Sequence, residues 1–248
     1  MTTLITGGGS QIGIHLAKLL KEAGREVIFA SRSGKRIPEG FKYVELDWYN
    51  EATFRNPFKF GPFENAYIIG PPDTLDPARV VIPFIDIAVQ EGVKRFVYLS
   101  ATIADEEHNE GGLGGIPKYL KERDLDRVIL RPTWFIGTNQ TSRKAFLADN
   151  SLTTDNLLTE HGEGVRERGE FETAVPTARV PFIATEDIAR AAFNGIVSEE
   201  NSVTSFILLG PEPLTYDQVS ILYHFPIESA TYSTHSLLLP PARCLAGR

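Results

Sequence analysis

The chain has 248 residues, of which 42% are hydrophobic and 23% are charged, and its net charge is −7. These values exclude collagen, coiled-coil and fully disordered proteins, and the acidic balance without a roughly 20-residue apolar segment makes nucleic acid and membrane poor partners. The single cysteine, Cys244, excludes an internal disulfide and favours a reducing compartment such as the cytoplasm.

Short apolar runs rich in branched and aromatic residues alternate with helical patterns along the chain. We expect strands at residues 3–5, 27–30, 43–46, 66–69, 96–99, 128–130 and 206–209. We expect helices at residues 11–23, 78–90 and 185–197, and a capping box at Thr215 and Gln218. The alternation predicts an α/β fold with a Rossmann-type doubly wound parallel sheet.

A glycine-rich turn follows the first expected strand and opens the first expected helix. There Gly7 permits a tight turn, the helix presents backbone N–H groups to a pyrophosphate, and Gly13 lets helix and strand approach closely. The fingerprint is imperfect, because its central glycine is replaced by Ser10 or Gln11, and a flexible turn without a ligand is the alternative. The cofactor-binding residues expected here are Thr6, Gly7, Gly9, Ser10, Gln11, Ile12 and Gly13.

The end of the second expected strand indicates which dinucleotide the chain binds. An NAD site places a carboxylate there for the ribose 2′-hydroxyl, whereas this chain has Ser31, Arg32 and Ser33. An arginine pairs with a 2′-phosphate that an acidic residue would repel, so the expected cofactor is NADP(H). The alternative for Arg32 is a solvated loop charge.

Other cofactor contacts are expected where later strands end, because ligands of open parallel sheets bind at the carboxyl ends of the strands. Asp47 and Trp48 follow the third strand and are placed to meet the adenine edge, although Asp47 also fits a turn-capping role. Gly70 and Pro71 follow the fourth strand and Pro132 ends the sixth. These five residues complete the expected cofactor site.

Candidate catalytic and substrate-binding residues follow the fifth and sixth strands. Ser100 is a candidate hydrogen-bond donor to a reacting atom, or only caps its strand. Lys118 is a candidate for ribose binding or proton relay, or lies on a solvated helix face. A Tyr-x-x-x-Lys pair is missing, since Tyr119 is followed four residues later by Arg123. The expected substrate-binding residues are Thr133, Trp134 and Phe135, with core packing as the alternative for Trp134.

The histidines show no metal-ligand spacing, so no metal site is expected, and no Gly-x-Ser-x-Gly motif for hydrolytic chemistry is present. The remaining evidence for function is a combined pattern of segments at residues 5–13, 29–33, 47–58, 92–97, 99–101, 130–135, 181–189 and 209–212. In this order the segments resemble the NmrA-like atypical short-chain dehydrogenases. They are most similar to the fungal ergot-alkaloid dehydrogenases of festuclavine and agroclavine type and to averufin-oxidase-like oxidoreductases.

The resemblance covers residues 2–137 and 174–220 and implies domains as well as an activity. Residues 1–137 are the expected NAD(P)-binding Rossmann core, and residues 181–220 the remainder of the core with a small, partly irregular C-terminal substrate lobe. Residues 138–180 are expected to be an irregular polar insert and residues 221–248 an irregular tail.

The implied activity is that of an NADP(H)-dependent oxidoreductase of fungal secondary metabolism, which transfers a hydride to or from a polycyclic alkaloid or an aromatic polyketide. In the alkaloid members this is reduction of an iminium or enamine carbon, which needs no strong general acid. One alternative is a non-catalytic NmrA-like regulator that senses NADP(H). The other is an inactive truncated product, because the insert and the tail depart from the family pattern.

Overall fold

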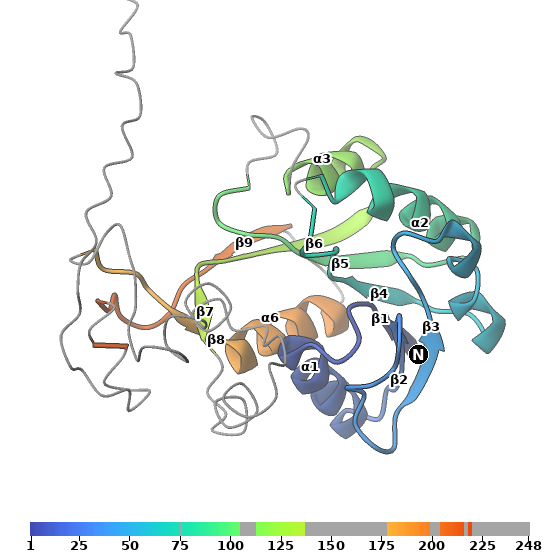
Figure 1. Ribbon diagram of the computed structural model, residues 1–248, viewed down its shortest axis with the longest axis horizontal. Coiled ribbons are helices and arrows are strands. Elements are labelled where there is room, and N and C mark those ends of the chain that lie inside the picture. Colours follow the sequence, from blue (N-terminus) through green and yellow to red (C-terminus); the bar gives the residue numbers. More distant parts are fainter. Residues whose placement is uncertain (75, 105–112, 137–177, 199–203, 216–217, 220–248) are drawn as a thin grey trace, which may run out of the picture.

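The computed structural model describes residues 1–74, 76–104, 113–136, 178–198, 204–215 and 218–219. Within these ranges, seven strands form one parallel sheet in the order β3-β2-β1-β4-β5-β6-β9 (Figure 1). The strands are β1 (Thr2–Ile5), β2 (Glu26–Ser31), β3 (Lys42–Glu45), β4 (Asn65–Ile68), β5 (Arg95–Leu99), β6 (Asp126–Pro132) and β9 (Ser205–Leu208). Each expected strand is confirmed to within two residues at either end.

Helices cover both faces of this sheet, which confirms the doubly wound architecture. Helices α1 (Gln11–Glu22) and α6 (Thr185–Val197) lie on one face, and α2 (Ala78–Gln90) and α3 (Gly115–Glu122) lie on the other (Figure 1). Two 3-10 turns, η1 (Glu51–Thr53) and η2 (Pro57–Phe60), connect β3 to β4. The three helices expected from the periodicity are confirmed, whereas α3 was expected only as a short helix around Lys118.

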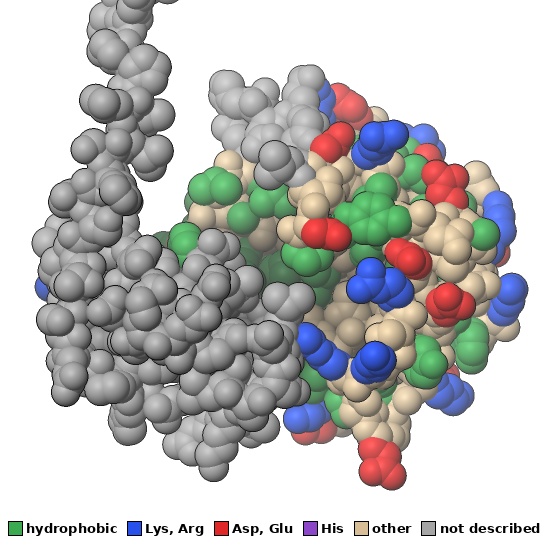
Figure 2. Space-filling view, in the orientation of Figure 1, with side chains coloured by type: hydrophobic (Ala, Val, Ile, Leu, Met, Phe, Trp, Pro, Cys, Tyr) green, Lys and Arg blue, Asp and Glu red, His purple; other side chains and the backbone are tan. Residues whose placement is uncertain are grey.

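The surface carries charges of both signs. Figure 2 shows acidic and basic side chains interspersed over the described part of one face, with apolar side chains between them. Among the described residues, no helix is both long enough and apolar enough to cross a membrane.

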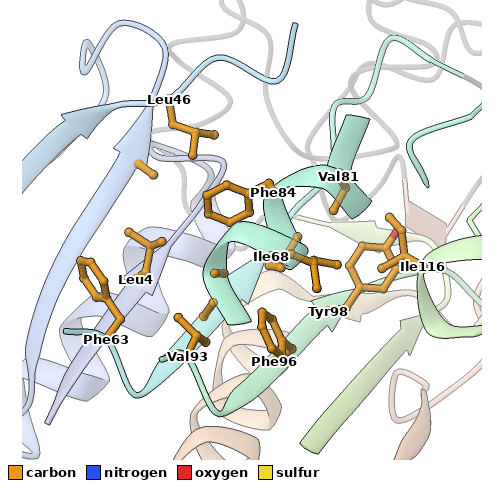
Figure 3. Packing of buried hydrophobic residues seen from close by; sticks show 14 of the residues in the cluster. Leu4, Leu46, Phe63, Ile68, Val81, Phe84, Val93, Phe96, Tyr98 and Ile116 are labelled. Atoms are coloured by element: carbon orange, nitrogen blue, oxygen red, sulfur yellow. The ribbon is translucent and has the colours of Figure 1, made fainter. Parts of the chain in front are cut away.

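The central strands are apolar throughout because both of their faces are covered. Leu4 of β1 points to the core beneath α2 and α3, whereas the next residue, Ile5, points to the core beneath α1 and α6. Figure 3 shows Phe84 of α2 directed onto the strands, between Leu46 and Ile68. Such runs, buried on both sides, distinguish parallel strands from the half-exposed strands of most antiparallel sheets.

The C-terminal part of the fold is only partly described. β7 (Phe135–Ile136) pairs in parallel with β8 (Ile183–Ala184), and Val180 forms an antiparallel bridge with Leu214. The capping box is confirmed, because the Gln218 amide donates to the Thr215 hydroxyl and the Thr215 amide donates to the Gln218 side chain. The expected tail, residues 221–248, and the expected insert, residues 138–180 except its last three, lie outside the described residues.

One buried group gives a test of the packing. Tyr67 of β4 is fully buried, and no described residue bonds its hydroxyl. Because burial raises the pKa of this phenol above its ordinary value, the group stays neutral. An unpartnered buried hydroxyl costs about 1–3 kcal/mol of desolvation, so we expect Tyr67→Phe to maintain the free energy of unfolding or raise it by about 1–2 kcal/mol.

Urea denaturation measures this change. Tyr119→Phe is the matched control, because it removes a hydroxyl that donates to Asp86, and it is expected to lower the free energy of unfolding. A clear loss of stability in Tyr67→Phe would show instead that an internal water or another group bonds the Tyr67 hydroxyl.

Candidate functional site

The strand order reverses direction between β1 and β4, and the crevice expected at such a switch is the candidate site. After β1 the chain adds β2 and β3 on one side, and then crosses to β4 on the other side of β1. In open parallel sheets, ligands bind at the carboxyl ends of the strands at this switch in direction. The loops that follow β1, β2, β3 and β4 therefore surround the candidate site.

Thr6 joins the loop after β1 to the neighbouring strand β4. The residue is fully buried, its amide donates to the Tyr67 carbonyl over 2.9 Å, and its hydroxyl accepts from the Ile69 amide over 2.9 Å. Gly7 follows with a φ of +63°, a left-handed conformation that confirms the expected tight turn. Thr6 thus acts as a structural link, and its hydroxyl is already used within the protein.

Ser10 is the N-cap of α1, which explains why the glycine fingerprint tolerates a serine. Its φ of −68° is an ordinary extended conformation, so this position does not need glycine. The Ser10 hydroxyl oxygen accepts from the Gly13 amide at 3.0 Å, which satisfies one of the helix donors that lack a partner in the helix. Helix geometry directs the first-turn amides of Gln11 and Ile12 toward the crevice end of α1.

The arm after β2 lies directly against the glycine loop. The Gly8 amide donates to the Ala30 carbonyl at 3.1 Å, and a Cβ added at Gly8 would lie 2.8 Å from Cβ of Ser31. A Cβ added at Gly9 would lie 2.3 Å from Cβ of Arg36. The glycines are therefore required for close approach, as expected for Gly13, where an added Cβ would meet the Ser10 hydroxyl at 2.9 Å.

The arm carries the residues expected to choose the dinucleotide. Ser31 accepts from the Gly34 amide at 3.2 Å and thereby closes the turn, while Arg32 and Ser33 are exposed. Arg36, which packs on Gly9, was missed by the sequence analysis. Its proximity to Arg32 and Lys35 in the sequence is the signal that would have found it.

The loop after β3 differs in part from the expectation. Thr53 holds Asp47 in place, because its hydroxyl accepts from the Asp47 amide at 2.9 Å, and the Asp47 carboxylate accepts from the Tyr49 amide at 3.1 Å. The Trp48 ring, expected at the adenine, packs edge-on against Phe54 and Phe84 of the core. The next residue, Tyr49, is exposed, and the sequence analysis missed it.

The loop after β4 is fixed at its start and reaches toward Tyr49 at its end. A Cβ added at Gly70 would lie 3.3 Å from Cβ of Pro77, just before α2, and Pro71 is buried. The Tyr49 hydroxyl donates to the Asp73 carboxylate at 2.6 Å. The loops after β3 and β4 are thus joined at the rim of the crevice.

The candidate catalytic residues have partners within the protein. Ser100 is buried at the end of β5, and its hydroxyl lies 3.4 Å from the Leu113 carbonyl, which it faces as a donor. Lys118 of α3 lies 3.9 Å from Glu122, one helical turn further on, and its side chain is one-third exposed. These contacts match the capping and solvated-face alternatives, and the catalytic roles of both residues stay predictions.

Of the three residues expected to bind substrate, two make contacts within the protein and one is exposed. The Thr133 hydroxyl donates to the Pro181 carbonyl at 2.6 Å, and Phe135 packs against the core beneath α1 and α6. Pro132, expected at the cofactor, is buried at the end of β6. Trp134 remains 38% exposed, which makes it the residue of this group that is placed to meet a ligand.

Among the described residues, four tyrosines have a pKa shifted upward, away from neutral pH. Burial and a hydrogen bond to the Asp86 carboxylate raise the pKa of Tyr119, and a hydrogen bond to Asp73 raises the pKa of Tyr49. Burial likewise raises the pKa of Tyr67 and of Tyr98. In the ranges that the structure describes, no three His, Cys, Asp or Glu side chains gather as a metal site.

Comparisons with known proteins identify the family. No protein-family model matches the chain. Agroclavine dehydrogenase of Claviceps fusiformis is 35% identical over 230 residues, which span 89% of this chain and 71% of that protein. Festuclavine dehydrogenase of Aspergillus fumigatus is 32% identical over 231 residues, which span 89% of this chain and 71% of that protein.

Solved structures support the fold. UDP-glucose 4-epimerase of Thermotoga maritima has a TM-score of 0.68 at 18% identity and covers 93% of this chain and 85% of its own. The NAD complex of UDP-glucose 4-epimerase from Thermus thermophilus has a TM-score of 0.63 at 17% identity, covering 87% and 79%. The agroclavine and festuclavine dehydrogenases, at 35% and 32% identity, show that the chain belongs to their family, the NmrA-like atypical short-chain dehydrogenases.

Proposed function

We propose that the chain is an NADP(H)-dependent oxidoreductase of fungal secondary metabolism that transfers a hydride between its cofactor and a carbon of a polycyclic alkaloid. An aromatic polyketide is the second substrate class. The relatives named as clavine dehydrogenases support the reaction class. The reducing compartment indicated by the single cysteine supports a place in the cytoplasm.

The observation that carries the proposal is the contact between the arm and the glycine loop. The Gly8 amide bonds the last core residue of β2, Ala30, so that the exposed Arg32 follows at the edge of the phosphate cradle. No carboxylate stands in the arm from Ser31 to Ile37 to bind a ribose 2′-hydroxyl. A guanidinium at this place favours a 2′-phosphate.

The glycine loop after β1 and the amino end of α1, together called the phosphate cradle, fit a dinucleotide. Side chains at Gly8, Gly9 or Gly13 would collide with the arm or with Ser10, so these positions need glycine for the tight strand-turn-helix packing that dinucleotide-binding turns use. The amino end of α1 adds backbone donors and a favourable dipole. When bound, the cofactor supplies or accepts the hydride.

The protein itself has to position the substrate against the nicotinamide. Addition of a hydride to an iminium carbon neutralises the positive nitrogen, so no proton has to be delivered in that step. This matches a site in which Ser100 and Lys118 have partners elsewhere. Trp134, at the start of the segment that leads into β7, supplies an exposed aromatic surface against which a flat substrate and the nicotinamide are held.

Cofactor titration followed by isotope transfer tests the proposal. We expect NADPH, at one hundred times its dissociation constant, to stabilise the protein by about 2.7 kcal/mol, and NADH to have a smaller effect. Deuteride from 4-deuterated NADPH is expected to appear in one of a panel of cyclic iminium and quinone substrates, as measured by mass spectrometry. No stabilisation by either nucleotide would contradict the proposal.

A non-catalytic NADP(H) sensor is the second candidate. The specific observation in its favour is that the described candidates for proton transfer, Ser100 and Lys118, are engaged by Leu113 and Glu122. Nucleotide binding without deuteride transfer to any member of the panel would favour this candidate over the enzyme.

A further inference from the structure

We propose that Tyr49 and Asp73 form a bridge over the rim of the adenosine subsite and position its two walls for the adenosine half of the cofactor. This inference rests on the proposed function and assigns a role to two residues outside the glycine loop and the arm. The bridge is the 2.6 Å hydrogen bond from the Tyr49 hydroxyl to the Asp73 carboxylate.

The bridge closes a ring of chain around one end of the crevice. In the sheet order β3-β2-β1-β4, three strand spacings of about 4.8 Å separate β3 from β4. Tyr49 follows β3 and Asp73 follows β4, so their bond joins two loops that begin on either side of the carboxyl ends of β2 and β1. The glycine loop and the arm begin at these two ends.

The position of Arg32 indicates which part of the cofactor lies within this ring. If this guanidinium holds the 2′-phosphate, the attached ribose and adenine lie beside the arm, between the loops after β3 and β4. The charge of Arg32 already acts on the Tyr49 phenol, where it opposes the rise in pKa caused by Asp73. The arm and the bridge therefore lie at the same end of the crevice.

Each end of the bridge is held by its own loop. The Asp47 carboxylate accepts from the Tyr49 amide, and Thr53 fixes Asp47, so the orientation of the loop after β3 is set before a ligand arrives. On the other side, Pro71 is buried and Gly70 lies close to Pro77. A hydrogen bond between two such loops fixes the width of the slot between them, which reduces the cost of ordering them on binding.

The bond is accessible rather than part of the core. Tyr49 is 54% exposed and Asp73 is exposed, so the bridge adds little burial to the fold. Its raised pKa keeps the Tyr49 hydroxyl protonated, and hence a donor, at neutral pH. Loss of the hydroxyl should therefore affect ligand binding more than folding.

A double-mutant cycle in the full chain tests the bridge. Calorimetry measures the dissociation constants of NADPH and of 2′,5′-ADP, which carries only the adenosine half. We expect Tyr49→Phe and Asp73→Ala each to weaken both ligands by about three- to tenfold, which lies within the net contribution of one ordinary hydrogen bond. The double variant should bind each ligand no more weakly than the single variant with the larger loss of affinity.

Two further variants separate positioning from a general loss of structure. Asp73→Asn retains an oxygen acceptor and is expected to bind within about twofold of the original chain. Tyr119→Phe removes a comparable tyrosine–aspartate bond between α2 and α3 and is expected to leave both affinities unchanged. In turnover, Tyr49→Phe should raise KM for NADPH and leave kcat unchanged.

The results distinguish this inference from the proposed function. Unchanged or tighter binding of 2′,5′-ADP by Tyr49→Phe, or fully additive losses in the double variant, would overturn the bridge while NADPH binding by the original chain still supports the enzyme. Absence of any nucleotide binding by the original chain would overturn both.

Discussion

Replacement of Arg32 by glutamate is expected to weaken NADPH binding at least about tenfold, or about 1.4 kcal/mol, and to leave NADH binding almost unchanged. The guanidinium is exposed on an arm that the Gly8–Ala30 bond holds against the glycine loop. In the proposed NADP(H) complex, a carboxylate at the same place loses the fork that pairs with the 2′-phosphate and adds repulsion toward it, while NADH has no phosphate there. Fluorescence titration with both nucleotides measures the two affinities.

Arg25→Glu is the matched control for this change. Arg25 precedes β2 at the amino end of the strand, whereas Arg32 follows its carboxyl end, and the substitution alters the net charge by the same amount. We expect it to leave the NADPH affinity within about twofold, since charges at that distance are screened. A ratio of NADPH to NADH affinity that is unchanged in Arg32→Glu would remove the specificity argument.

Substitution of Gly9 by alanine is expected to lower kcat/KM for NADPH on the order of a hundredfold. Gly9 has a φ of +90°, and an added Cβ would lie 2.3 Å from Cβ of Arg36, so the arm has to move by about 1 Å or more. Misplacement on this scale costs on the order of 10² in rate when it disturbs the bound geometry. Steady-state kinetics with saturating substrate measure the loss.

Gly92→Ala separates this effect from backbone strain. Gly92 has nearly the same φ, +93°, but an added Cβ there meets no atom within 4 Å. Both variants should lose about 1–2 kcal/mol of folding free energy from the left-handed conformation, and only Gly9→Ala should lose cofactor affinity. Equal kinetic losses in the two variants would show that strain, rather than the position of the arm, is responsible.

The strands and the glycine loop could be predicted because their signals are local. A run such as Val27 to Ala30 is apolar on both faces, and the glycines stand between a strand pattern and a helix pattern. Spacing alone also indicated that Lys118 pairs with Glu122, since residues four apart are neighbours on a helix. The sequence analysis did not use that signal.

The rim of the site could not be predicted because it depends on distant contacts. Trp48 and Tyr49 are adjacent in the sequence, and packing against Phe84, far along the chain on α2, decides which ring turns inward. The partner of Tyr49, Asp73, follows a strand that is not adjacent to β3 in the sheet. Local patterns contain neither piece of information. The site roles of the residues expected to bind cofactor and substrate stay predictions until nucleotide binding is measured.

The contact between α1 and α6 limits how freely the protein can evolve. Gln11 opens α1 beside the cradle, and its side-chain oxygen lies 3.4 Å from the hydroxyl of Thr185, which opens α6 directly after β8. One turn along α1, His15 lies 3.3 Å from Glu186. Because this junction lies in residues 181–220, which contain the proposed substrate lobe, mutations there that change substrate choice would also disturb the first turn of α1. Divergence in substrate choice is then constrained by a trade-off with nucleotide affinity.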